Sequence, residues 1–231
     1  MNTKIIISLL LTATVSFAFG WIYAYKRLPP SPIVAKILRT YFFNYERGEQ
    51  KASSERINLS ATNPDIIFLG DSLTAHGKFS EFFSSPPRIY NRGVDGDTAF
   101  DILDRLENII SLKPKAVYLM IGINDFHRGA HPQQVANNIK QIHNKLEKEG
   151  IDVLLQKTIQ CQKNKCSYIK EVNELNKIIS SIHGYNVIDL GELNSTNGLN
   201  SSLTYDGIHL NLNGYKVWKE QLLRAPNSNF E

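Results

Sequence analysis

The segment that decides the fold is residues 65–73, Asp-Ile-Ile-Phe-Leu-Gly-Asp-Ser-Leu. A short apolar run is followed at once by a glycine, an acid and a serine. This order is typical of a buried strand that turns sharply into a helix. The segment therefore predicts a strand of an α/β sheet, with Ser72 exposed on the turn that follows it.

Four more apolar runs follow, and amphipathic stretches separate them. This alternation predicts a parallel sheet with helices on both faces, which makes a three-layer α/β/α domain. The expected strands are residues 65–69, 88–91, 116–121, 152–157 and 187–189. The expected helices are residues 98–111, 132–149, 167–183 and about 213–223, and residues 194–203 are expected to form a surface loop.

The composition fits one globular domain with an N-terminal addition. The chain has 231 residues, of which 42% are hydrophobic, and a formal net charge of +4. Its Lys and Arg residues are scattered among acids, so nucleic acid is not an expected partner. The two cysteines, Cys161 and Cys166, have no histidine cluster beside them, which argues against a zinc site. They either close a small disulfide loop outside the cytoplasm or stay reduced inside it.

The N-terminal segment is expected to direct the chain to a membrane. Residues 5–25 form an almost uncharged apolar run, which predicts a membrane-spanning anchor or a secretory signal; a core helix is the other alternative, but the run is long for a buried helix. Positive charges after the run outnumber those before it and favour a cytoplasmic domain, whereas a disulfide favours the opposite side. We expect an exported domain, periplasmic or extracellular, that is either tethered or released. The expected organisation is residues 1–28 as signal or anchor, 29–60 as a connector with an amphipathic helix, and 61–231 as the catalytic domain.

In parallel α/β sheets, ligands bind beyond the carboxyl ends of the strands. Three of these ends carry suitable residues: Ser72 after the first strand, Gly93 after the second and Asn124 after the third. A serine hydroxyl can attack a carbonyl once a base removes its proton. The backbone N–H groups of Ser72 and Gly93 and the side-chain amide of Asn124 would then form an oxyanion hole for the developing charge. Taken alone, Asp71 and Ser72 would read as an ordinary helix cap.

The base is chosen from six histidines. Only His209 has an acid at a short fixed spacing in a loop, in Asp206-Gly-Ile-His209. That carboxylate can accept the Nδ1 proton and leave Nε2 for the serine. The remaining histidines are expected to contact substrate or to have surface or capping roles: His76, His127, His131, His143 and His183.

These blocks carry a resemblance to a known family. Their order and spacing, from about residue 65 to residue 223, resemble the SGNH (GDSL-like) hydrolase superfamily, and the part from 91 to 112 is similar to platelet-activating-factor acetylhydrolase catalytic subunits and related bacterial esterases. The resemblance implies a flavodoxin-like fold with a five-stranded parallel sheet, here preceded by a hydrophobic helix. It implies Ser72 as nucleophile, His209 as base, Asp206 as its partner and Gly93 and Asn124 as oxyanion donors. It also implies that no metal or organic cofactor takes part.

The expected function is hydrolysis of carboxylic esters through an acyl-serine intermediate. Short acyl groups are favoured because no long apolar insertion lies near the expected active edge. A lipase or lysophospholipase that acts on longer chains remains an alternative. An O-acyltransferase of envelope polysaccharide is a second alternative, since it shares the same acyl-enzyme, and a non-catalytic binding module is a third. The expected partners are a small ester, an acylated glycan or a lipid, and a membrane if the N-terminal segment is retained.

Overall fold

Five parallel strands form the central sheet of the computed structural model, which describes residues 63–83 and 87–226, with Gly48 and Phe230. The strand order is β2-β1-β3-β4-β5, the flavodoxin-like order. The strands are β1 (Ile66–Gly70), β2 (Ile89–Gly93), β3 (Ala116–Met120), β4 (Asp152–Gln156) and β5 (Asn186–Ile188). Each overlaps its predicted range, so the predicted three-layer fold is confirmed.

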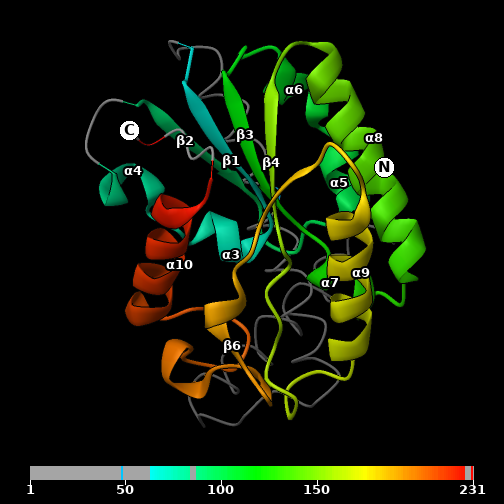
Figure 1. Cartoon of the computed structure of the whole chain (residues 1–231), viewed down its shortest axis with the longest axis vertical. Coiled ribbons are helices and arrows are strands. Elements are labelled where there is room, and N and C mark those ends of the chain that lie inside the picture. The colour runs from blue at the N-terminus through cyan, green and yellow to red at the C-terminus, as the bar shows by residue number, and fades with distance from the viewer. Residues whose placement is uncertain (1–47, 49–62, 84–86, 227–229, 231) are drawn as a thin grey trace, which may run out of the picture. The chain divides into compact units, whose positions relative to one another are not determined.

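Side chains alternate along the strands and build a core on each face of the sheet. Ile67 and Leu69 belong to one core, whereas Ile66 and Phe68 belong to the other. The first core is covered by α5 (Ala99–Asp104), α6 (Leu106–Ile110), α8 (Pro132–Lys148) and α9 (Ile169–Ser181), and Phe126 of α7 (Ile123–His127) joins it. The second is covered by α3 (Ser72–Ala75), α4 (Phe79–Phe82) and α10 (Leu212–Arg224). Figure 1 shows α8 and α9 on one side of the sheet and α4 and α10 on the other.

One predicted helix is broken in the structure. The sequence predicted a single helix over residues 98–111, but the chain leaves the helical path at Arg105, which separates α5 from α6. The Arg105 guanidinium is buried, where it donates to a carboxylate oxygen of Asp97 at 2.8 Å and to the Arg92 carbonyl at 2.8 Å. These buried contacts account for the break, because they hold Arg105 in a non-helical conformation.

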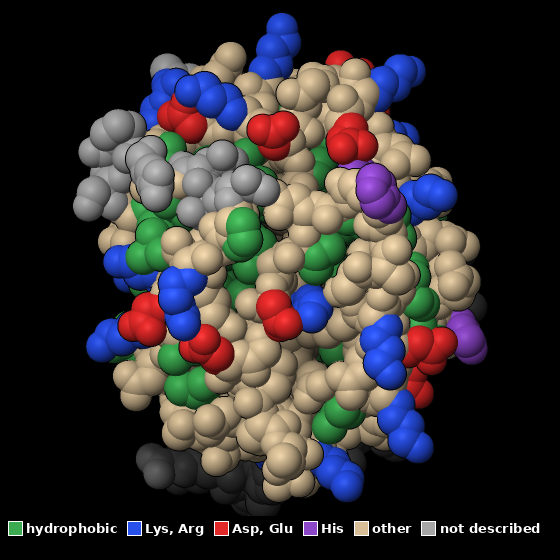
Figure 2. Space-filling model, viewed as in Figure 1, with side chains coloured by type: hydrophobic (Ala, Val, Ile, Leu, Met, Phe, Trp, Pro, Cys, Tyr) green, Lys and Arg blue, Asp and Glu red, His purple; other side chains and the backbone are tan. Residues whose placement is uncertain are grey.

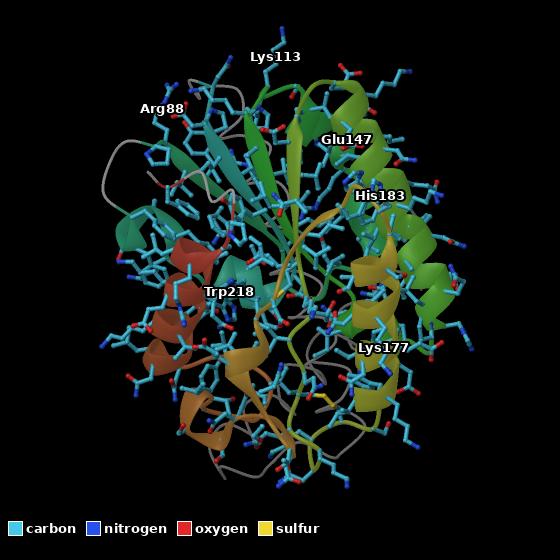
Figure 3. All side chains as sticks on the ribbon, in the orientation of Figure 1. Arg88, Lys113, Glu147, Lys177, His183 and Trp218 are labelled. Carbon is cyan, nitrogen blue, oxygen red and sulfur yellow. A yellow bond between two sulfur atoms is a disulfide. The ribbon has the colours of Figure 1, made fainter. Side chains whose placement is uncertain are left out.

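The last helix is tied to the sheet by two buried hydrogen bonds. In α10, the indole N–H of Trp218 donates to Gln156 of β4 at 2.7 Å, and the Tyr215 hydroxyl donates to the Leu73 carbonyl at 2.8 Å. Figure 3 labels Trp218 on the face of α10 that meets the sheet. Because Leu73 follows Ser72, these bonds connect the C-terminal helix to the turn that carries the serine.

Small elements fill the region between β5 and α10. The predicted surface loop at 194–203 contains a short hairpin of β6 (Asn194–Ser195) and β7 (Gly198–Leu199), followed by the 3-10 helix η2 (Ser201–Leu203). Before it lies the 3-10 helix η1 (Gly191–Leu193).

The predicted N-terminal segments, residues 1–28 and 29–60, lie outside the described residues. Within the described part, no helix is long and apolar enough to cross a membrane. On the face drawn in Figure 2, basic and acidic side chains are interspersed.

Candidate active site

The ends of three neighbouring strands bring the predicted site residues to one edge of the sheet. Strand β1 lies between β2 and β3, and its last residue, Gly70, pairs with Gly93 on one side and with Met120 on the other. Ser72 begins α3 directly after β1, and Asn124 lies in α7 after β3. This edge between β1 and β3 is where the strand order reverses, the usual place for a ligand in such folds (Figure 1).

Ser72, His209 and Asp206 form one chain of hydrogen bonds. The Ser72 hydroxyl lies 3.1 Å from Nε2 of His209, although 137 residues separate them in the sequence. On the other side of the ring, Nδ1 of His209 lies 2.7 Å from Oδ2 of Asp206. The His209 side chain is about one quarter exposed, so the chain of hydrogen bonds is open to a substrate.

The Asp206 carboxylate is held by its own loop as well as by the histidine. Its Oδ1 accepts the backbone N–H groups of Ile208 at 2.8 Å and of His209 at 2.7 Å. Burial alone would raise the pKa of Asp206, but the hydrogen bonds from His209 and Ile208 outweigh it and lower the pKa to about 2. The carboxylate is therefore charged at any ordinary pH and can fix the ring and its tautomer.

The three predicted oxyanion donors differ in their hydrogen bonds. Ser72 is the first residue of α3, so its N–H has no acceptor within the helix. The side-chain amide of Asn124 donates one N–H to the Asp97 carbonyl at 3.0 Å, and the same nitrogen carries a second. The N–H of Gly93, however, donates to Oδ1 of Asn91 at 2.8 Å. Gly93 can bind an oxyanion only by sharing this proton or exchanging its acceptor.

Comparisons with known proteins show the family of the chain. Residues 68–217 match the model of the GDSL-like Lipase/Acylhydrolase family. The chain belongs to this family. It is 30% identical over 172 residues to the platelet-activating factor acetylhydrolase IB subunit alpha1 of Rattus norvegicus, covering 66% of this chain and 70% of that protein. As an acylhydrolase of this family, the protein is a carboxylic ester hydrolase.

Solved structures of GDSL-type esterases share the fold. A GDSL-like lipase from Bacteroides thetaiotaomicron superposes with a TM-score of 0.67 at 20% identity, covering 75% of this chain and 97% of that one. An acetyl xylan esterase superposes with a TM-score of 0.61 at 23% identity, covering 69% of this chain and 98% of that one.

In this GDSL-like acylhydrolase, Asn91 is a site residue that the sequence analysis did not assign. Besides accepting the Gly93 N–H, its side-chain amide donates to three carbonyls at the end of α3 and just beyond, those of Thr74, Ala75 and Gly77, at 2.7, 3.2 and 2.7 Å. Asn91 therefore joins β2 to the helix that begins with Ser72. A Cβ at Gly93 would collide with the backbone of Ala75, so only glycine fits this close approach. The only sequence signal was an Asn two residues before that glycine.

Buried carboxylates lie behind Ser72 in this acylhydrolase. Asp71 caps α3 by accepting the Leu73 N–H at 3.0 Å. Burial raises the pKa of Asp71 to about 7, and the charges of nearby aspartates add to the effect. Burial also raises the pKa of Asp125 to about 6, although that carboxylate accepts the N–H of Ala99. Asp97, a third buried carboxylate, forms an ion pair with Arg105.

The other histidines take no part in the hydrogen-bond chain. His76 is the nearest, with its ring centre 5.5 Å from that of His209, and its Nε2 lies 3.3 Å from an oxygen of Asp95. His143 is buried in α8, and this burial lowers its pKa. His183 is exposed just beyond the end of α9, where Figure 3 labels it. Within the described part of the chain, no group of three or more His, Cys, Asp or Glu side chains could hold a metal ion.

Proposed function

We propose that this acylhydrolase is a serine esterase in which Ser72 is the nucleophile, His209 the general base and Asp206 the group that orients the base. The observation that carries the proposal is the chain of two hydrogen bonds, 3.1 Å from Ser72 to His209 and 2.7 Å from His209 to Asp206. Both distances are within the reach that proton transfer requires.

The reaction has two halves. In acylation, Nε2 of His209 takes the hydroxyl proton while Oγ of Ser72 attacks the ester carbonyl, whose electron pair moves onto oxygen. The tetrahedral intermediate collapses, the carbon–oxygen bond to the alcohol breaks, and the alcohol leaves with the proton from His209. In deacylation, His209 takes a proton from water, which attacks the acyl-serine, and the acid leaves as the proton returns to Ser72.

The oxyanion formed in each half needs donors. The proposed donors are the Ser72 N–H, the second N–H of the Asn124 amide and the Gly93 N–H. The last becomes available when the oxyanion competes with Asn91 for it, because a charged acceptor forms a stronger hydrogen bond than a neutral amide oxygen. Loss of a single such donor costs about 10²–10³ in rate in comparable sites.

The proposed substrates are short acyl esters, with acetate on a sugar hydroxyl as the first choice. The rat relative is named an acetylhydrolase and one structural neighbour an acetyl xylan esterase, so both names refer to acetyl groups. A further observation concerns the alcohol, which must leave on the side of His209 because it takes its proton from there. The Tyr205 ring lies 5.9 Å from the His209 ring, tilted by 15°, and is 65% exposed. A flat exposed ring at this place suits stacking against a sugar.

The test measures hydrolysis of p-nitrophenyl esters of increasing chain length by the full chain and by Ser72→Ala. Ser80→Ala is the matched control, because Ser80 is an exposed serine of the nearby helix α4. Acetyl ester hydrolysis that Ser80→Ala retains and Ser72→Ala loses supports the nucleophile, as does a mass increase of one acetyl group on Ser72. Activity that survives in Ser72→Ala refutes it.

Further measurements test the proposed substrate class. A preference for long chains would contradict the short-acyl proposal. Transfer of acetate to an added sugar at the expense of hydrolysis would mark an acyltransferase. For the alcohol side, Tyr205→Ala should raise KM for an acetylated xylooligosaccharide but leave hydrolysis of ethyl acetate, whose alcohol has no ring, unchanged.

We also propose export of this domain. The apolar run of residues 5–25 and the Cys161–Cys166 disulfide support it, because disulfides persist mainly outside the cytoplasm. Cell fractionation followed by N-terminal sequencing tests it, and a protein recovered in the cytosol with free thiols would contradict it.

A further inference from the structure

The loop between β4 and α9 carries a disulfide that the proposed ester hydrolysis does not use. Cys161 is completely buried and Cys166 partly buried, and their bond closes a ring across the four residues between them (Figure 3). Inside this ring, the N–H groups of Lys165 and Cys166 both donate to the carbonyl of Gln162, at 2.9 and 3.2 Å. The ring, residues 161–166, is called the disulfide loop below.

The disulfide loop lies directly against the loop that carries Asp206 and His209. The backbone N–H of Gln162 donates to the carbonyl of Gly207 at 2.8 Å. Gly207 has a φ of +91°, and a Cβ at this position would come within 2.5 Å of Cγ of Lys165, which belongs to the disulfide loop. The positive φ favours glycine at this position, and the close approach of Lys165 adds to that preference.

A single peptide group connects the disulfide loop to the carboxylate that orients the base. The peptide between Gly207 and Ile208 accepts from Gln162 through its carbonyl, and its N–H donates to Oδ1 of Asp206 at 2.8 Å. Because a peptide group is planar and rigid, fixing its carbonyl also fixes the direction of its N–H. The position of Gln162 thus bears on Asp206, whose other oxygen faces His209.

The opposite side of the same loop is held by Thr204. Its hydroxyl accepts the Gly207 N–H at 2.8 Å and donates to the His209 carbonyl at 2.6 Å. Gly207 is therefore held on both sides, by Thr204 and by the disulfide loop. The disulfide loop is itself held against β7, where the Leu199 N–H donates to the Cys161 carbonyl at 3.3 Å.

We propose that the Cys161–Cys166 disulfide is a positioning element of the active site, which holds Gln162 against the Gly207–Ile208 peptide and so keeps Asp206 and His209 aligned. This inference rests on the proposed roles of those two residues. A small dithiol reduces the bond, giving two cysteine thiols while the dithiol becomes a cyclic disulfide. The freed loop then loses its hold on the peptide, and kcat falls while KM changes little.

The experiment measures p-nitrophenyl acetate hydrolysis by the full chain before and after dithiothreitol, with complete reduction shown by a count of two thiols. Reduction should lower kcat about fivefold or more, the effect expected from loss of one positioning hydrogen bond. The Cys161→Ala, Cys166→Ser double variant should reproduce the loss without reductant. Asn164→Ala, at an exposed position of the disulfide loop, is the control and should keep its full kcat and its response to reduction.

A role limited to stability is separated by the Asp206→Asn variant. If the disulfide acts through Asp206, reduction should change the residual kcat of this variant less than twofold, because the alignment it protects is already lost. The inference would be overturned if reduction lowered kcat by the same factor in the wild type and in Asp206→Asn, or if the fully reduced wild type kept its kcat. Neither result would contradict the proposed function. That proposal fails instead if the oxidised wild type hydrolyses no ester. Chemical reduction of the native protein keeps the test valid if the double variant does not fold.

Discussion

The buried carboxyl group of Asp71 should make the stability of the protein depend on pH. Its pKa is about 7 in the folded protein, because burial and the neighbouring aspartates disfavour the charge, against an ordinary value of 3.8. The folded protein therefore binds a proton that the unfolded chain releases between these values. The resulting stabilisation is complete below about pH 4 and is lost as the pH rises through 7, a total of about 4 kcal/mol. About 2.5 kcal/mol of it is lost between pH 5 and pH 8.

Asp71→Asn tests this value directly. The amide is neutral at every pH, and its oxygen can still accept the Leu73 N–H that Asp71 accepts at 3.0 Å. Urea unfolding of both proteins at pH 5, 6, 7 and 8 gives the difference in their free energies of unfolding, in which other titrating groups such as Asp125 largely cancel. The variant should gain about 2.5 kcal/mol relative to the wild type between pH 5 and pH 8. A difference that stays constant within about 0.5 kcal/mol would refute the reasoning, because Asp71 would then carry its charge without cost.

Three further predictions concern Thr204, Tyr215 and Asp206. Thr204→Val removes the hydroxyl that donates to the His209 carbonyl, so steady-state kinetics should show kcat lowered about tenfold with little change in KM. Tyr215→Phe removes the donor to the buried Leu73 carbonyl and should lower the free energy of unfolding by about 1–2 kcal/mol in urea titrations. Asp206→Asn should lower kcat by about 10³–10⁴. With a pKa of about 2, Asp206 itself should produce no step in the wild-type pH–rate profile above pH 4. A step there that disappears in the variant would contradict this assignment.

The strands could be predicted because their signal is local. A run such as residues 116–121 is apolar throughout, since both faces of β3 (Ala116–Met120) are buried. Its boundary differs from the prediction by one residue. Short elements such as α4 and α7 could not be predicted, because four or five residues do not show a helical period. The break at Arg105 depends on Asp97, a partner fixed by the tertiary fold.

The contacts of the candidate site also differ in how far the sequence could predict them. The contact between Asp206 and His209 spans three residues, so the spacing alone suggested it. The contact between Ser72 and His209 spans 137 residues and was predictable only through the arrangement of blocks along the chain. The bond from Gln162 to Gly207 joins two backbone groups, which any residue pair could supply. No side-chain pattern marks such a bond, so sequence reasoning could not find it.

The distance between Ser72 and His209 is set by packing remote from both residues. Ser72 belongs to the first strand–helix turn of the described chain, and His209 directly precedes its last helix, α10. Two buried bonds from α10, by Tyr215 to the Leu73 carbonyl and by Trp218 to Gln156, fix that helix against α3 and β4. Because the core is close-packed, a change in the position of α10 against the sheet must move His209 relative to Ser72. Substitutions on the buried face of α10 should therefore lower kcat even where they leave every group of the site in place.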